Sequence, residues 1–178
     1  PHDFLVDGMG EVVKYGMIKS DELFGILMNH DINTVHEVMD DIIARCVAIK
    51  RDVVEADEFD KGERMLLNFG HTLGHSIEQY YHYTGISHGR AVAKGMEIIT
   101  DLAEKRGMCR KGLTADLCGC LKKYELTRDI GPTPAQLGSA CMNDKKRDGS
   151  SIHVIICSDI GKSSAVKMSV ADFNDFLA

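Results

Sequence analysis

The stretch Arg64-Met-Leu-Leu-Asn68-Phe-Gly-His71-Thr-Leu-Gly-His75-Ser-Ile-Glu78 carries the clearest pattern in the sequence. At about 100° per residue, polar side chains at spacings of four, three and four fall in one stripe roughly 60° wide: Arg64, Asn68, His71 and His75. Apolar side chains fall on the opposite side: Leu66, Phe69, Leu73 and Ile77. The pattern predicts one helix that buries its apolar face and gathers polar groups on the other.

Two glycines, Gly70 and Gly74, lie one turn apart on a third strip of this predicted helix. A glycine in a helix interior costs about 1 kcal/mol relative to alanine. Two of them so close together indicate that another backbone approaches the helix at this strip.

The polar stripe is open to two interpretations. A single histidine on a buried face is usually a hydrogen-bonded core residue, and His71 and His75 could both be of this kind. A guanidinium, an amide and two imidazoles that face inward together are costly to bury without an ion or a polar ligand, which favours a metal or catalytic site. A zinc-protease helix is disfavoured, because Thr72 stands where that motif needs glutamate as a general base.

Length, composition and charge set the broad class. The chain has 178 residues, 44% hydrophobic and 27% charged, which is typical of a soluble globular protein with one domain or two small ones. The formal net charge of −6 and the lack of a basic stripe argue against a nucleic-acid partner. No apolar run is long enough to span a membrane, and Pro1-His2-Asp3 does not open a signal peptide.

The cysteines show neither C-x-x-C pairing nor the spacing of a disulfide framework: Cys46, Cys109, Cys118, Cys120, Cys141 and Cys157. We expect reduced and partly buried thiols that behave as small hydrophobic side chains. Such thiols are typical of a cytoplasmic protein or of an organelle with a reducing interior.

Turn signals and hydrophobic spacing predict the other elements. Residues 1–9 are expected to be irregular, and helices are expected over residues 10–18, 21–29, 35–54, 88–106, 114–124, 135–142 and 172–177. A β-rich segment predicts an antiparallel hairpin of residues 152–157 with residues 165–170. No repeat or linker divides the chain. We therefore predict a single, mainly helical domain over residues 1–178 with a small β-hairpin near the C-terminus.

Three residues far apart in the sequence form a candidate metal site: Glu11 on the first helix, His71 on the central helix and His88 at a loop-to-helix junction. Two histidines and one glutamate with an open fourth position are a known catalytic zinc arrangement. Simpler interpretations exist for the charged residues. Glu11 and Lys14 alone would be a solvated helix pair, and Lys50 alone a cation near a helix C-terminus.

Four segments together resemble the C-terminal domain of 3-dehydroquinate synthase: Gly8-Met-Gly-Glu11-Val-Val-Lys14-Tyr15-Gly16, the stretch from Arg64 to Glu78, His88-Gly89-Arg-Ala-Val-Ala, and Asp144-Lys145-Lys146. They occur in the family's order, and Asn-Phe-Gly-His-Thr-x-Gly-His is the most specific of them. The resemblance implies that Glu11, His71 and His88 bind a metal ion, usually Zn²⁺ or otherwise Co²⁺. It also implies a substrate pocket lined by His75, Lys14, Lys50, Arg64, Asn68 and a lysine of the pair Lys145 and Lys146.

The family converts 3-deoxy-arabino-heptulosonate 7-phosphate to 3-dehydroquinate and phosphate, in the shikimate pathway of aromatic amino-acid biosynthesis. The resemblance implies that the metal ion acidifies a substrate hydroxyl and that NAD takes up a hydride and returns it. The lysines and Arg64 would bind the carboxylate and the phosphate of this sugar acid. His75 and the substrate's own phosphate both stay open as proton-transfer groups, and the full-length protein is expected to be a homodimer.

The family also has an N-terminal NAD-binding domain with a Gly-rich phosphate loop. This sequence contains no G-x-G-x-x-G or similar run after a strand. We therefore expect the chain to be a fragment that lacks this domain. Because the family's active cleft lies between the two domains, the fragment alone is expected to bind NAD poorly and to be inactive.

Arg90 departs from the family pattern, in which glutamate usually follows His-Gly. This departure keeps other enzymes of the same architecture open: another sugar-phosphate cyclase, or a metal-dependent polyol dehydrogenase. A dehydrogenase would not need a phosphate pocket, so the lysines argue mildly against it. A third alternative is a non-catalytic helical module that acts by association, whose histidines are core residues and which binds no stoichiometric metal.

Overall fold

The computed structural model describes residues 1–57, 62–145 and 151–178, with the backbone alone for residues 140–145. These residues form α-helices, two short 3-10 helices (η) and one two-stranded antiparallel sheet, which confirms the predicted fold class. The elements in order are α1 (His2–Lys19), α2 (Asp21–Asn29), η1 (Val35–Val38), α3 (Met39–Ala56), η2 (Glu63–Asn68), α4 (His71–Tyr80), α5 (His88–Lys105), α6 (Leu113–Lys123), α7 (Pro134–Lys145), β1 (Ile152–Asp159), β2 (Lys162–Met168) and α8 (Val170–Leu177).

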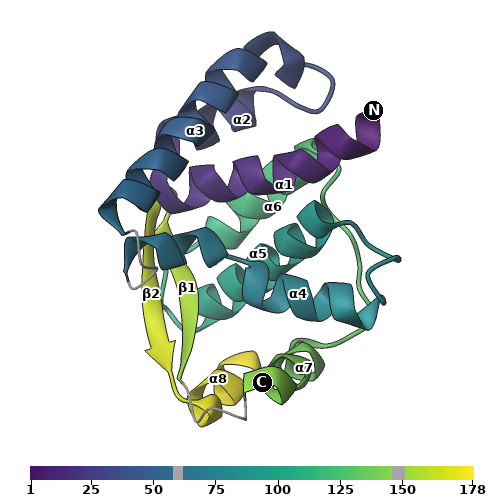
Figure 1. Cartoon of the computed structure of the whole chain (residues 1–178), viewed down its shortest axis with the longest axis vertical. Coiled ribbons are helices and arrows are strands. Elements are labelled where there is room, and N and C mark those ends of the chain that lie inside the picture. The colour runs from purple at the N-terminus through teal and green to yellow at the C-terminus, as the bar shows by residue number, and fades with distance from the viewer. Residues whose placement is uncertain (58–61, 146–150) are drawn as a thin grey trace.

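The centre of the molecule is built from α1, α4 and α5, with α5 packed against both α1 and α4 (Figure 1). Helices α2 and α3 lie on one side of α1, and α6 packs behind it against α5. Helices α7 and α8 lie at the opposite end of the molecule, and the hairpin runs along one edge between the two ends. The candidate metal ligands belong to the three central helices.

Helix α1 begins at His2, so the expectation of an irregular segment over residues 1–9 is wrong. Val6, Met9 and Val13 are fully or almost fully buried and follow one another at helical spacing. Asp3 lies in the first turn, where a negative charge is favourable. The first nine residues thus continue the apolar stripe of the helix, a pattern too short to be recognised when it is separated from residues 10–18.

Glycines allow the central helices to pack unusually closely. A methyl group on Gly74 of α4 would lie 3.2 Å from Cα of Val92 in α5, and one on Gly95 would collide with the carbonyl of Gly70. A methyl group on Gly10 of α1 would lie 2.6 Å from the carbonyl oxygen of Gly89 in α5. The prediction that another backbone approaches Gly70 and Gly74 is therefore confirmed, and that backbone belongs to α5.

The predicted single helix from Arg64 to Glu78 is wrong. Residues Glu63–Asn68 form η2, and the chain then turns at Gly70, whose φ of 78° lies in the left-handed region. Glycine adopts that conformation without the steric penalty of other residues, so Gly70 both breaks the helix and leaves room for α5. Arg64 and Asn68 consequently do not share a helical stripe with His71 and His75.

The ends of the other helices follow the sequence signals more closely. The Ser20 side chain accepts a hydrogen bond from the Leu23 N–H and caps α2, as a serine before an acidic first turn predicts. The helix expected over residues 35–54 begins as η1 and continues as α3 to Ala56.

The hairpin fixes the end of α1. Strands β1 and β2 pair in register from Ile152 with Met168 to Cys157 with Ser163. At the turn, the Gly161 N–H donates to the Met17 carbonyl at 3.0 Å, and the Ser163 hydroxyl donates to the Ile18 carbonyl at 3.0 Å. The C-terminal end of α1 is thus anchored on a sheet that is formed by distant sequence.

The five cysteines with described side chains are unpaired: Cys46, Cys109, Cys118, Cys120 and Cys157. Burial raises the pKa of Cys46 to about 11 and the pKa of Cys120 to about 12, which keeps both thiols protonated at neutral pH. The expected small hydrophobic thiols are confirmed for these residues. Within the described part of the chain, no helix is both long and apolar enough to cross a membrane.

Candidate metal centre

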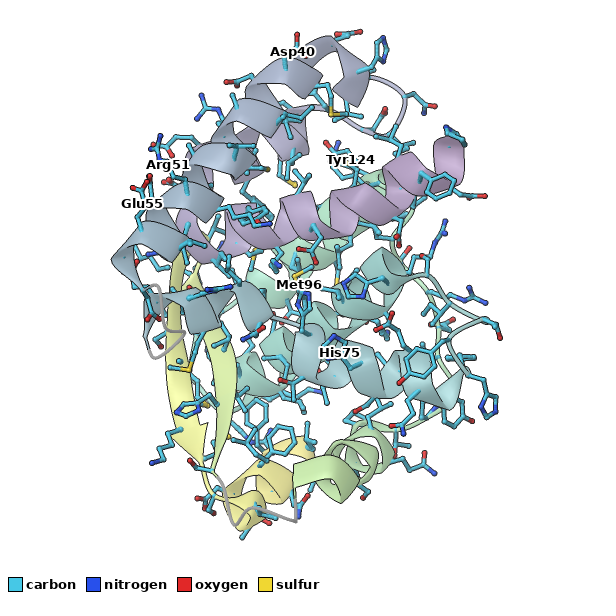
Figure 2. All side chains as sticks on the ribbon, in the orientation of Figure 1. Asp40, Arg51, Glu55, His75, Met96 and Tyr124 are labelled. Atoms are coloured by element: carbon cyan, nitrogen blue, oxygen red, sulfur yellow. The ribbon has the colours of Figure 1, made fainter. Side chains whose placement is uncertain are left out.

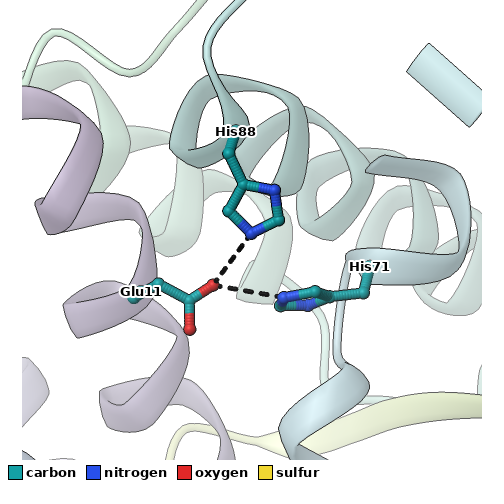
Figure 3. A group of neighbouring side chains, drawn as sticks. All are labelled: Glu11, His71 and His88. Atoms are coloured by element: carbon teal, nitrogen blue, oxygen red, sulfur yellow. Dashed lines mark ion pairs between the residues drawn. The ribbon is translucent and has the colours of Figure 1, made fainter. Parts of the chain in front are cut away.

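Glu11, His71 and His88 point toward one another from three different helices (Figure 3). Glu11 Oε1 lies 3.2 Å from His71 Nε2 and 3.7 Å from His88 Nε2. One potential ligand atom from each of the three residues lies within 4.8 Å of the other two. The structure therefore brings together the three residues that the sequence nominated, although they are up to 77 positions apart (88 − 11).

These separations suit a small divalent cation. Zinc binds histidine nitrogen and carboxylate oxygen at about 2.0–2.2 Å, so two ligand atoms of a tetrahedral site lie about 3.3–3.6 Å apart. The two measured separations, 3.2 and 3.7 Å, bracket that range. Only small side-chain movements would be needed to enclose an ion, and three protein ligands would leave a fourth position for a substrate oxygen.

The break before α4 orients His71. Its Nδ1 lies 3.1 Å from the Phe69 carbonyl oxygen, two residues back along the chain. Phe69 precedes the turn at Gly70 and the first residue of α4, so its carbonyl is available to accept the Nδ1–H of His71. With a metal ion between His71 and Glu11, a proton on Nδ1 would leave the Nε2 lone pair to bind the ion. The expectation of a continuous helix missed this contact.

Glu11 is held as a carboxylate. Burial would raise its pKa, but the interactions with His71 and with the Lys14 ammonium outweigh burial and lower the pKa of Glu11 to about 2. Its Oε2 accepts a hydrogen bond from Lys14 Nζ at 2.5 Å, whereas its Oε1 is buried and lacks a hydrogen bond of acceptable geometry. A buried carboxylate oxygen that lacks a hydrogen bond and faces two imidazoles fits a site for a bound cation.

Lys14 and Lys50 lie close to this group. The Lys14 side chain is only 3% exposed, and its ammonium also lies 5.3 Å from the centroid of the Tyr15 ring. Burial lowers the pKa of Lys14 although Glu11 opposes the shift, and the charge of Lys50 on α3 lowers it further. Glu11 and Lys14 are therefore a largely buried pair, and the interpretation of a solvated helix pair is wrong.

His75 completes a group of three imidazoles. Its ring centroid lies 5.6 Å from that of His71 and 6.2 Å from that of His88. Figure 2 shows His75 on α4. It follows His71 by one helical turn, and its side chain is exposed to solvent. His75 thus lies beside the candidate metal position, next to both candidate ligand histidines.

Other predicted pocket residues lie on η2 and at the end of α7. Arg64 and Asn68 lie on η2, just before the turn that leads into α4, and Asn68 is exposed. Lys145 is the last residue of α7, and its side chain lies outside the described part of the structure, as does all of Lys146. Their predicted role in binding the substrate stays a prediction.

Asp7 is a structural residue of the site that the sequence did not reveal. Its Oδ1 accepts a hydrogen bond from the Gly89 N–H at 2.5 Å and so caps the first turn of α5, where the Ser87 side chain makes no capping bond. Asp7 lies one turn before Glu11 on the same face of α1. The sequence showed that Asp7 and Glu11 are one helical turn apart. It did not show that the Asp7 carboxylate binds the Gly89 N–H, because this contact depends on the crossing of α1 and α5.

A family model described as 3-dehydroquinate synthase C-terminal matches residues 8–147. The chain belongs to the 3-dehydroquinate synthase family. The matched region contains Glu11, His71 and His88 and all other residues nominated for the site.

Curated relatives support the same family. The 3-dehydroquinate synthase of Clostridium perfringens strain 13 is 44% identical over 175 residues, which is 97% of this chain and 50% of the relative. That of Streptococcus thermophilus strain LMD-9 is 40% identical over 177 residues, with the same shares. The chain thus spans about half the length of these members of the family.

Solved structures share the fold at low identity. A 2-epi-5-epi-valiolone synthase from Streptomyces hygroscopicus subsp. jinggangensis, with NAD⁺ and Zn²⁺ bound, matches 99% of this chain and 51% of its own at a TM-score of 0.83 and 23% identity. A 2-deoxy-scyllo-inosose synthase complexed with carbaglucose-6-phosphate, NAD⁺ and Co²⁺ matches with a TM-score of 0.78 and 21% identity. The chain therefore shares its fold with about half of each of these two synthases.

Proposed function

We propose that this chain is the metal- and substrate-binding half of a 3-dehydroquinate synthase, which forms 3-dehydroquinate and phosphate from 3-deoxy-arabino-heptulosonate 7-phosphate. The observation that carries the proposal is the convergence of Glu11, His71 and His88 in a chain that belongs to this family. The isolated half is expected to be inactive, because the dinucleotide is expected to bind to the half of the relatives that this chain does not cover.

The donor set fits a zinc or cobalt ion, the metals that accompany the two solved cyclases. Glu11, His71 and His88 would hold it, and it would supply Lewis acidity toward a substrate hydroxyl or carbonyl. NAD⁺, also present in both solved cyclases, would supply a reversible hydride acceptor and end the cycle unchanged.

The residues around the metal position give this half its own tasks. His71 and Lys14 lower the pKa of Glu11, and Lys14 binds one of its oxygens, so that the other faces the histidines. His75 is not needed as a ligand, and its ring lies near both ligand histidines. We assign to it a hydrogen bond to a substrate oxygen and, together with the substrate's phosphate, a part in proton transfer.

The substrate carries a carboxylate and a phosphate, and this half offers cations for both. Lys50 lies close enough to Lys14 to act on its pKa. Arg64 lies on η2 at the entrance to α4, where a guanidinium could bind an oxyanion with two hydrogen bonds. Lysines 145 and 146 remain proposed contacts to the phosphate.

The test joins this chain to the N-terminal half of the Clostridium perfringens relative and measures phosphate release from 3-deoxy-arabino-heptulosonate 7-phosphate with NAD⁺ and Zn²⁺. We expect phosphate release that requires both NAD⁺ and Zn²⁺. Release should fall at least about 1,000-fold in a His71→Ala variant, because this variant lacks one of the proposed ligands of the metal ion that activates the substrate. The unjoined chain should release no phosphate. The relative's own two halves, joined in the same way, are the positive control.

Arg90 supports one alternative, a cyclase of the same family architecture with another substrate. Arg90 lies two residues after His88 in the first turn of α5, where the family pattern has glutamate. A substrate panel that includes glucose 6-phosphate, which lacks the carboxylate, separates the two functions. A joined protein that binds Zn²⁺ and NAD⁺ but turns over only a sugar phosphate without a carboxylate would contradict the proposed substrate.

A further inference from the structure

His88 is the most exposed of the three candidate ligands. Its side chain is 42% exposed, against 16% for His71, and it stands at the first residue of α5. The ring of His71 is held by a backbone carbonyl through Nδ1, whereas no backbone group among the described residues forms a hydrogen bond with the His88 ring. The exposed imidazole therefore needs another partner if it is to present Nε2 to Glu11.

Glu78 is that partner. Its Oε1 lies 3.2 Å from His88 Nδ1, on the side of the ring opposite to Nε2. The Glu78 side chain is only 14% exposed, so its charge is shielded from water by the surrounding helices. The residue lies on α4, seven positions after His71, which places the two side chains on the same face and two turns apart.

A carboxylate behind a histidine selects one tautomer. An ionised carboxylate only accepts hydrogen bonds, so the proton of a neutral imidazole is drawn to the nitrogen that faces it. Both ring nitrogens of His88 face a carboxylate, but Glu78 Oε1 lies within hydrogen-bond distance of Nδ1, at 3.2 Å, whereas Glu11 Oε1 lies 3.7 Å from Nε2. The proton is therefore drawn to Nδ1, and the lone pair lies on Nε2. The same selection by a carbonyl or carboxylate is the usual arrangement behind histidines that bind metal.

We propose that Glu78 is a positioning residue: it fixes the tautomer and the ring orientation of His88, and it thereby raises the affinity of the site for a divalent cation. The inference rests on the proposed metal site and adds a residue to which the family resemblance gave no role. In this arrangement α4 supplies one ligand directly, His71, and controls a second one, His88, through Glu78.

A second ion is the competing explanation, because His75, Glu78 and His88 also bring ligand atoms within 4.8 Å of one another. Both groups include His88. Two ions bound at once through its two nitrogens would require an imidazole that has lost both protons. One ion with Glu78 as the hydrogen-bond acceptor needs only the neutral ring.

The experiment measures zinc affinity of the 178-residue chain by competition with a chelating indicator, for the unchanged chain and for Glu78→Ala and Glu78→Gln. We expect one zinc ion per chain. Affinity should fall about 10- to 100-fold in Glu78→Ala. In Glu78→Gln it should fall much less, because the amide oxygen still accepts the Nδ1–H.

Two controls separate positioning from general damage. Glu97→Ala removes a carboxylate of comparable exposure, 26%, which pairs with Lys94 at 2.6 Å further along α5, and it should leave zinc affinity unchanged. Circular dichroism and thermal unfolding of the metal-free variants check that each one folds. Long-range ¹H–¹⁵N correlation spectra of metal-free protein report the tautomer of His88 directly: Nδ1–H in the unchanged chain, and a loss of this preference in Glu78→Ala.

The outcomes distinguish the inference from the function on which it rests. If a folded Glu78→Ala variant binds zinc as well as the unchanged chain does, or if His88 keeps its Nδ1–H tautomer without Glu78, the inference is wrong and the metal site stands. Two zinc ions per chain, of which Glu78→Ala loses one, would establish the second-ion explanation. If the unchanged chain binds no zinc, the proposed metal site itself fails.

Discussion

Lys14 places a positive charge beside a site that we expect to bind a cation. The ammonium and the cation can coexist because each binds a different oxygen of Glu11. The Lys14 ammonium binds Glu11 Oε2 and leaves Oε1 to the histidines, so the carboxylate is shared between a fixed cation and the metal position. The lysine is almost fully buried, at 3% exposure, whereas Glu11 is 34% exposed. A pair of this kind is costly to break, because the remaining partner keeps its desolvation penalty.

We expect Lys14→Met to lower the free energy of unfolding of the metal-free chain by about 1–3 kcal/mol, less than for a fully buried pair because Glu11 retains some contact with water. Urea unfolding at pH 7 measures this change. The matched control is Lys105→Met, which breaks an exposed pair with Asp101 and should cost less than about 1 kcal/mol. Equal losses in the two variants would show that the Lys14 pair is not specially buried.

At the scale of the helices, the site depends on how closely α4 and α5 approach. His71 and His88 belong to these two helices, and Gly95 packs its Cα against the Gly70 backbone at the turn that begins α4. Any side chain at Gly95 must push the helices apart, because the obstacle is backbone that cannot rotate away. The glycine contacts thus set the distance between two of the three candidate ligands.

Gly95→Ala is therefore expected to destabilise the chain by about 1–3 kcal/mol or more and to weaken zinc binding. Gly119→Ala on α6 is the matched control: nothing lies within 4 Å of the methyl group that it adds, so it should raise stability by up to about 1 kcal/mol. Thermal unfolding and zinc titration of both variants check the prediction. A stabilised Gly95→Ala variant with normal zinc affinity would contradict the close approach.

Glu104 gives α6 a pH-dependent cap. Its carboxylate accepts hydrogen bonds from the N–H groups of Gly112 at 2.6 Å and Thr114 at 2.9 Å. Hydrogen bonds from Thr114 and from Gly112 lower its pKa from the ordinary 4.5 to about 2. Because the folded-state pKa is lower, this contribution to stability is complete above about pH 4.5 and is lost as the pH falls toward 2.

We accordingly expect Glu104→Gln to be less stable than the unchanged chain at pH 7, with a difference that shrinks between pH 4.5 and 2. Chemical unfolding at a series of pH values measures it. Glu37→Gln, which removes an exposed carboxylate in η1, is the control variant for the same series of measurements. A constant difference for Glu104→Gln from pH 7 to pH 2 would contradict the role of its charge.

At the scale of the whole molecule, the sequence predicted the fold class and the three side chains that meet at the site. Helical spacing identified most helices, and the residue types of Glu11, His71 and His88 indicated metal chemistry. It could not predict the break at Gly70, because the periodic spacing of polar and apolar residues continues through it. The partners of Asp7 and Glu78 were also hidden, since both bind groups on another helix and depend on packing rather than on local pattern.

We expect one divalent cation to bind between Glu11, His71 and His88. Zinc-edge anomalous diffraction from crystals of the purified chain grown with Zn²⁺ tests it most directly. We expect a single strong peak about 2.0–2.2 Å from Glu11 Oε1 and from Nε2 of both histidines, and no such peak in a His71→Ala variant. A chain with no ion at these three atoms, or with its only ion bound elsewhere, would contradict the account.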